Sequence, residues 1–168
     1  MKMLVYCQHV LGIGHFFRII EICRALAGHD IVLVSGGLET PGELPANVRH
    51  RQLPELAMDH NFKNLHSPSG QLLEAVKVQR RRKLKALFLA ERPDIFLVEL
   101  YPIGRRAFRF ELDPLLSAIA GGGLPRCKVV CSVRDILVDK EKRARHEAWA
   151  VDILNRQFDM LVVHADPS

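Results

Sequence analysis

Short apolar runs alternate with longer amphipathic stretches along the whole chain. Compact apolar runs, each followed by glycine or polar residues as buried strands often are, occupy residues 3–6, 31–34, 95–98, 128–133 and 160–163. A weaker alternation over 48–53 predicts one further, more exposed strand. Because helical stretches separate most of these strands, the chain is predicted to form an α/β fold, a doubly wound, mostly parallel sheet of about six strands.

Apolar residues at spacings of three and four predict the helices. One stripe begins after Gly14 and ends at Gly28, which is typical of a C-terminal glycine. A second helix, over 71–92, has a stripe interrupted by the charged run 79–83, which we interpret as a solvated face, with contact to anionic lipid or nucleic acid as the alternative. Residues 54–68 show no clear period and predict a long loop.

Two more helices are predicted in the second half of the chain. The pair Asp113-Pro114 is typical of an N-cap followed by proline at the first helical position, within a region of helical spacing that ends before Gly121. The last helix begins at about Asp139. Its predicted apolar face is formed by Ala144, Ala148, Val151, Leu154 and Phe158.

Composition changes this picture little. With 168 residues, 48% apolar and 26% charged, the chain fits a single globular domain over 1–168. Its four cysteines form no C-x-x-C pair, which predicts buried reduced thiols and a cytoplasmic location. No signal peptide and no apolar run of the roughly 20 residues that span a membrane are found. The net charge of +5 favours anionic partners, but no nucleic-acid module is recognised, so nucleic acid is not an expected partner.

Candidate chemistry begins at the first predicted strand-to-helix turn, Gly12-Ile-Gly-His15. The free N–H groups at a helix start suit a phosphate or another anion, although a simple capping turn is the alternative. This turn is not a dinucleotide fingerprint, because Phe17 stands where the third glycine would be, and no Walker Lys-Ser/Thr pair follows. Neither a cofactor nor a metal ion is therefore predicted.

His15 lies in the first turn of the predicted helix, at the carboxyl edge of the sheet where ligands bind in such folds. A helix N-terminus opposes a positive charge, which favours a neutral imidazole able to accept a proton as a general base. A capping or surface histidine is the alternative. Arg18, one turn later, is placed to hold an anion or to pair with Glu21.

Polar residues also follow the other predicted strands. Ser35-Gly36-Gly37 follows the second strand and Arg134 the fifth. Glu99 follows the fourth strand, and the neighbouring residues Arg105 and Arg106 come shortly after it. The two arginines predict either an anion site or an ion-pair cluster with Glu99 and Glu111.

These segments together resemble the N-terminal half of a GT-B glycosyltransferase. The resemblance is to predicted bacterial enzymes related to the N-acetylglucosaminyltransferase that completes the lipid-linked cell-wall precursor. The matching segments cover nearly the whole chain in order: 12–18, 35–37, 99–106 with 110–112, 132–137 and 163–167. The first of them is also similar to nucleotide-sugar hydrolases of the same fold.

The resemblance implies the acceptor-binding half of an inverting glycosyltransferase that uses a nucleotide-sugar donor, with His15 as the catalytic base. It also implies a carbohydrate or lipid-linked acceptor, with peripheral membrane contact as an added expectation. It further implies a donor-binding C-terminal domain that the 168 residues do not contain. The chain alone is therefore expected to be inactive. A hydrolase or a non-catalytic carbohydrate- or anion-binding module remains the alternative. The expected substrate-binding residues are Gly12, Gly14, Arg18, Ser35, Gly36, Gly37, Glu99, Arg105, Arg106 and Arg134.

Overall fold

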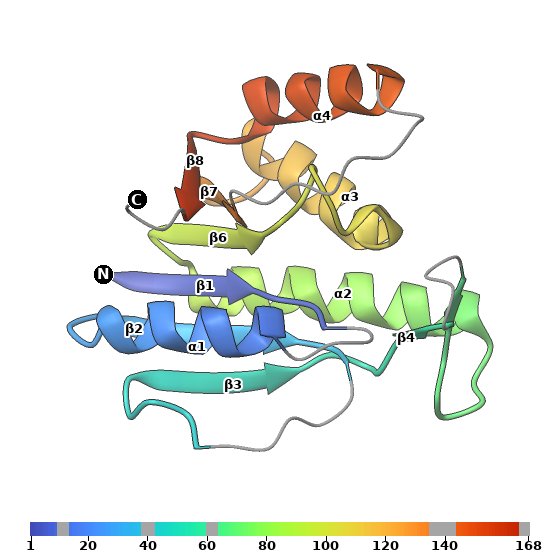
Figure 1. Ribbon diagram of the computed structural model, residues 1–168, viewed down its shortest axis with the longest axis horizontal. Coiled ribbons are helices and arrows are strands. Elements are labelled where there is room, and N and C mark those ends of the chain that lie inside the picture. Colours follow the sequence, from blue (N-terminus) through green and yellow to red (C-terminus); the bar gives the residue numbers. More distant parts are fainter. Residues whose placement is uncertain (10–13, 38–42, 60–63, 135–143, 165–168) are drawn as a thin grey trace.

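A computed structural model describes residues 1–9, 14–37, 43–59, 64–134 and 144–164. Its centre is a six-stranded parallel sheet in the order β3-β2-β1-β6-β7-β8 (Figure 1). The strands are β1 (Lys2–Tyr6), β2 (Asp30–Ser35), β3 (Val48–Gln52), β6 (Ile95–Glu99), β7 (Lys128–Arg134) and β8 (Met160–His164). The helices are α1 (Gly14–Ala25), α2 (Leu73–Glu91), α3 (Arg109–Ala120) and α4 (Ala144–Gln157), with a 3₁₀ turn η1 (Arg106–Phe108) before α3. The predicted α/β class and parallel sheet are confirmed.

The chain reverses its direction across the sheet between β1 and β6. From β1 it proceeds to β2 and β3, and α2 then carries it back to β6 on the other side of β1. In doubly wound sheets, ligands bind outside the carboxyl ends of the strands at such a switch point. The fold therefore directs attention to the residues that follow β1 and β6.

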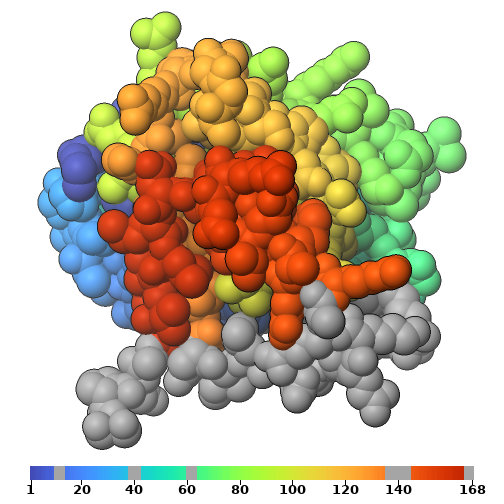
Figure 2. All heavy atoms as spheres, turned by 90° about the horizontal axis from the view of Figure 1, so that it is seen from above, coloured from blue at the N-terminus to red at the C-terminus, as the bar shows by residue number. Residues whose placement is uncertain are grey.

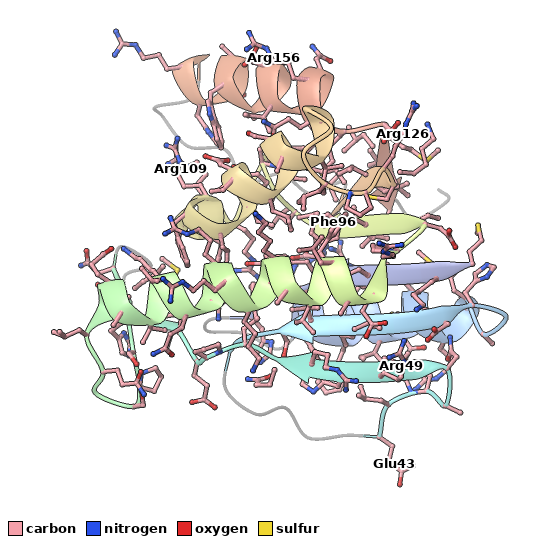
Figure 3. The ribbon with its side chains drawn as sticks, turned by 180° about the vertical axis from the view of Figure 1, so that it is seen from behind. Glu43, Arg49, Phe96, Arg109, Arg126 and Arg156 are labelled. Carbon is pink, nitrogen blue, oxygen red and sulfur yellow. The ribbon has the colours of Figure 1, made fainter. Side chains whose placement is uncertain are left out.

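Two apolar clusters cover the two faces of the sheet. On one face, Phe16, Ile19 and Cys23 of α1 pack against the buried side chains of β1 and β2. On the other face, α2 and α3 lie across β1, β6 and β7. Figure 3 views that face and labels Phe96, whose ring packs edge-to-face on Phe88 of α2 at a centroid distance of 5.9 Å. Complete burial of Phe88 and Phe96 explains why α2 lies in this position.

The structure corrects two expectations about element boundaries. Residues 54–68 are not all loop, since Ala57–Met58 and Leu65–His66 form a short antiparallel pair, β4 and β5. Helix α3 begins at Arg109, so Asp113-Pro114 is inside the helix and not at its start. Pro114 cannot donate a backbone hydrogen bond within the helix. Burial of the apolar stripe that begins at Phe108 stabilises the helix enough to offset this loss, so packing decides where the helix begins.

Helix α4 is rotated relative to its predicted face. Val151 is 53% exposed, whereas Ala150 is 5% exposed and Ile153 packs on the core. Trp149 sets the rotation, because its ring packs edge-to-face on buried Tyr101. Figure 2 shows α4 and the edge strand β8 together on the outer surface.

The charged run 79–83 is also not a uniformly solvated face. Arg80 is 0% exposed and continues the buried stripe of α2, while Arg81 and Arg82 are exposed and Lys83 donates to the Gln52 carbonyl at 2.6 Å. A sequence stripe defined by apolar residues alone misses Arg80, because burial of its charge depends on partners elsewhere in the chain. No helix in the described residues is long and apolar enough to cross a membrane.

Candidate functional site

The switch point between β1 and β6 brings together a histidine, a carboxylate and two arginines. His15 is the second residue of α1, and Glu99 is the last residue of β6. The adjacent parallel strands β1 and β6 place these residues side by side although 84 positions separate them. Arg18 reaches the same carboxylate from the next turn of α1, and Arg105 does so from the turn after β6.

Glu99 is the centre of this cluster, and its side chain is 0% exposed. Its Oε1 atom lies 2.6 Å from His15 Nδ1 and accepts a hydrogen bond from Arg18 Nη2 at 2.7 Å. Arg105 Nε lies 3.7 Å from Oε2 in a looser ion pair. Two arginines thus compensate the negative charge of the buried Glu99 carboxylate.

An ionised carboxylate determines which nitrogen of His15 carries the proton. A carboxylate can only accept, so the short contact requires Nδ1–H to donate to Glu99. In the neutral ring, Nε2 then keeps its lone pair, and the imidazole side chain is 30% exposed. An imidazole held in this way can accept a proton at Nε2.

The turn after β6 is shaped by two residues with left-handed backbones. Leu100 has φ of 64° and Arg105 has φ of 55°, values that non-glycine residues adopt only at a cost. Gly104 lies between them, and a Cβ there would come within 2.8 Å of the Leu100 side chain. This tight turn returns Arg105 toward Glu99, so that unfavourable local conformation is used to complete the cluster.

Arg18 has more donors than the described residues use. Its side chain is 20% exposed, and its Nε and Nη1 atoms are buried without a hydrogen-bond partner among the described residues. The adjacent start of α1, at Gly14 and His15, adds backbone N–H groups that have no acceptor within the helix itself. These donors can together bind an anionic group of a ligand.

The residues after β2 have a different environment. Ser35 is 1% exposed, and its hydroxyl bonds His50 Nε2 and Gln52 Oε1, each at 2.7 Å. A Cβ on Gly36 would clash with the Arg80 guanidinium, and one on Gly37 would clash with the His9 backbone. Close packing therefore requires glycine at both positions, and their role in substrate binding stays a prediction.

Two other predicted site residues, Arg106 and Arg134, are exposed at the carboxyl edge of the sheet. Arg106 is exposed at the start of η1, and Arg134 is exposed at the end of β7. Gly12 lies outside the described residues. Glu111 does not join Glu99 in one ion-pair cluster, because it pairs with buried Arg80 on the other face of the sheet.

His164 lies within the matching segment 163–167 but was not among the predicted site residues, and the structure places it near Arg18. It ends β8 beside Arg134 of β7, and its Nε2 atom lies 2.9 Å from the Ser132 hydroxyl. Burial, with a smaller effect of the Arg18 charge, lowers the pKa of His164 below its usual value. The feature of the sequence that could have identified His164 is its place directly after the apolar run 160–163.

Among the described residues, no group of three or more His, Cys, Asp or Glu side chains is arranged to hold a metal ion.

Comparison with solved structures finds glycosyltransferases. The chain is similar to the Streptomyces sp. SF2575 glycosyltransferase SsfS6 with a TM-score of 0.56 and 18% identity, covering 99% of this chain and 51% of that one. It is similar to apo UGT2 of Phytolacca americana with a TM-score of 0.53 and 13% identity, covering 98% and 46% of the two chains. The spinosyn rhamnosyltransferase SpnG, solved with thymidine diphosphate, matches with a TM-score of 0.51 and 14% identity, covering 99% and 46%.

These similarities confirm the resemblance to GT-B glycosyltransferases at the level of the fold. The chain spans about half the length of the glycosyltransferases it matches. Comparison with protein-family models and with curated sequences gives no match.

Proposed function

We propose that the chain is the acceptor-binding half of an inverting glycosyltransferase that uses a nucleotide-sugar donor. The observation that carries the proposal is the 2.6 Å contact between His15 Nδ1 and buried Glu99 at the switch point of the sheet. The fold shared with glycosyltransferases, two of them solved with thymidine diphosphate, supports a nucleotide-linked donor.

In the proposed reaction, His15 Nε2 removes the proton from an acceptor hydroxyl. The hydroxyl oxygen then forms a bond to the anomeric carbon of the sugar, and the bond from that carbon to the donor's diphosphate breaks. Attack from the side opposite the leaving group inverts the configuration. Glu99 stabilises the imidazolium that forms, because its carboxylate already accepts from Nδ1–H.

Arg18 and Arg105 have a second role in this proposal. Their guanidinium groups compensate the Glu99 charge, and the unused donors of Arg18 bind an anionic part of the acceptor or of the donor. We include Gly14, Arg106 and Arg134 at the rim of the same site, as the resemblance implies. The free cysteines support a reducing, cytoplasmic location.

We further propose that donor binding belongs mainly to a second domain. The support is that the chain corresponds to about half of SsfS6 and of UGT2. On this proposal the 168 residues alone bind an acceptor but do not transfer sugar.

The test uses the full-length protein and the substitution His15→Ala. Loss of the base is expected to reduce kcat by about 100- to 10,000-fold, with donor affinity unchanged. Glu99→Gln is expected to reduce kcat as well, since an amide no longer enforces the Nδ1–H tautomer. The matched control is His66→Ala, because His66 is exposed on β5, away from the cluster.

Product analysis distinguishes transfer from the alternatives. Glycoside as the product supports the proposal, whereas free sugar that appears regardless of acceptor indicates a hydrolase in which His15 activates water. Acceptor binding without turnover by the full-length protein indicates a binding module. An unchanged kcat in His15→Ala contradicts the assignment of the base.

A further inference from the structure

Arg80 is a buried residue that the proposed reaction does not use, and all five of its N–H groups are bonded. Its Nε and Nη2 donate to the two oxygens of Glu111 at 2.9 and 2.6 Å. Nη2 also donates to Gln8 Oε1 at 2.9 Å. Nη1 donates to the Gly36 carbonyl at 3.1 Å and to the Pro54 carbonyl at 2.7 Å.

These bonds connect the parts of the chain that follow three neighbouring strands. Gln8 follows β1, Gly36 follows β2, and Pro54 follows β3. Arg80 itself is in the middle of α2, and Glu111 belongs to α3. One guanidinium therefore joins three loops at the carboxyl edge of the sheet to the two helices behind it.

The surroundings keep Arg80 charged and in place. Burial alone would lower its pKa, but the charge and hydrogen bonds of Glu111 raise it. Tyr6 donates to the same carboxylate, and burial together with Glu111 raises the pKa of Tyr6, so that its hydroxyl stays protonated. The guanidinium also lies over the Phe108 ring, 5.3 Å from its centroid.

We propose that Arg80 is a positioning residue that fixes the residues directly after β1, β2 and β3, namely Gln8, Gly36 and Pro54, in the conformation that binds the acceptor. A buried ion pair is often no more stabilising than an apolar pair of the same volume, so stability alone does not account for it. The three bonds to Gln8, Gly36 and Pro54 are what an apolar pair could not supply. The consequence for catalysis rests on the proposed function, whereas the consequence for loop order does not.

Two conservative substitutions separate the loop contacts from the ion pair. Arg80→Lys keeps the positive charge beside Glu111, but a single ammonium cannot reach all three loop oxygens. Glu111→Gln removes the negative charge and leaves the Nη1 bonds to Gly36 and Pro54 in place. If Arg80 and Glu111 form only a structural ion pair, Glu111→Gln should loosen the loops at least as much as Arg80→Lys does. If Arg80 positions the loops, Arg80→Lys should loosen them more than Glu111→Gln does.

Amide hydrogen exchange of the full-length protein measures the loops directly. The amides of Leu53 and Leu56 donate to the carbonyls of Ser35 and Gly36 at 2.8 and 2.9 Å. We expect Arg80→Lys to accelerate their exchange at least about tenfold relative to the amides of β1 and β6, and Glu111→Gln to do so much less. Equal acceleration in the two variants, or acceleration only in proportion to that of β1 and β6, overturns the proposal.

Kinetics of the full-length protein give the second readout. We expect Arg80→Lys to raise KM for the acceptor about tenfold and to change kcat little, because His15 and Glu99 are untouched. Gln8→Leu, a milder change that keeps the ion pair, is expected to raise KM in the same direction and serves if Arg80→Lys does not fold. An unchanged KM in a folded variant overturns the catalytic consequence. If the wild-type protein transfers no sugar, the proposed function fails and hydrogen exchange alone decides the role of Arg80.

Discussion

Gly36→Ala tests whether close packing fixes the loop after β2. A Cβ at this position would clash with Arg80 Nη1 and lie 2.8 Å from both Arg80 Cζ and Gln8 Oε1. Those atoms cannot withdraw freely, because Arg80 is fully buried and bonded on all sides. The methyl group must therefore displace either the guanidinium or the loop.

The expected magnitude follows from the bonds at risk. Displacement weakens the bonds from Nη1 to the Gly36 and Pro54 carbonyls, and hydrogen bonds to charged groups contribute about 1.5–3 kcal/mol each. Overpacking adds about 1–3 kcal/mol of strain. If relaxation recovers part of the loss, we expect the free energy of unfolding to fall by about 3–5 kcal/mol, which lowers Tm by roughly 6–20 °C for a domain of this size.

Urea denaturation followed by circular dichroism measures this change, and Gly28→Ala is the matched control. Gly28 follows α1, a Cβ there meets nothing within 4 Å, and its backbone is not left-handed. We expect Gly28→Ala to be neutral or to stabilise by up to about 1 kcal/mol through the unfolded state. Gly36→Ala and Arg80→Met should also be non-additive, because each removes the same contacts. A Gly36→Ala protein as stable as Gly28→Ala would refute the packing explanation.

Further predictions concern the buried thiols and α4. Burial, with a smaller effect of the Glu99 charge, raises the pKa of Cys131 to about 12 and raises that of Cys7 still further. At pH 8 both thiols should therefore react with a disulfide reagent only when the protein unfolds, and fast labelling of the native protein would contradict this. Val151→Lys on the exposed face of α4 should change the free energy of unfolding by less than about 0.5 kcal/mol, whereas Ala150→Lys should lower it by several times more. Urea denaturation measures both changes, and equal effects would contradict the observed rotation of α4.

The order of elements was predictable because each strand and helix carries its own pattern. The apolar runs at 3–6, 31–34, 95–98, 128–133 and 160–163 became the sheet strands β1, β2, β6, β7 and β8, and 48–53 became β3. The periods of strands and helices are local properties, so the order of apolar and polar residues over a short stretch is enough to recognise them. The carboxyl edge as the place of the candidate site followed from the same α/β order.

Local patterns failed where a neighbour from another part of the chain decided the outcome. Trp149 rotated α4 because it packs on Tyr101. Pro114 became part of a helix because Leu112, Leu115 and Leu116 on either side of it are buried. Arg80 looked like one residue of a solvated charged run, yet its buried partner Glu111 lies 31 positions away.

The pattern of residues along the chain was enough to predict the fold class, the alternation of strands and helices, and the individual candidate residues. The three-dimensional arrangement was needed to show which of these residues lie together. It placed Glu99 against His15, and it assigned Gly36 and Gly37 to close packing with Arg80 and His9. The physical reason is that secondary structure depends on short-range periodicity, whereas a buried charge is stable only beside partners that the crossover connections bring from distant positions.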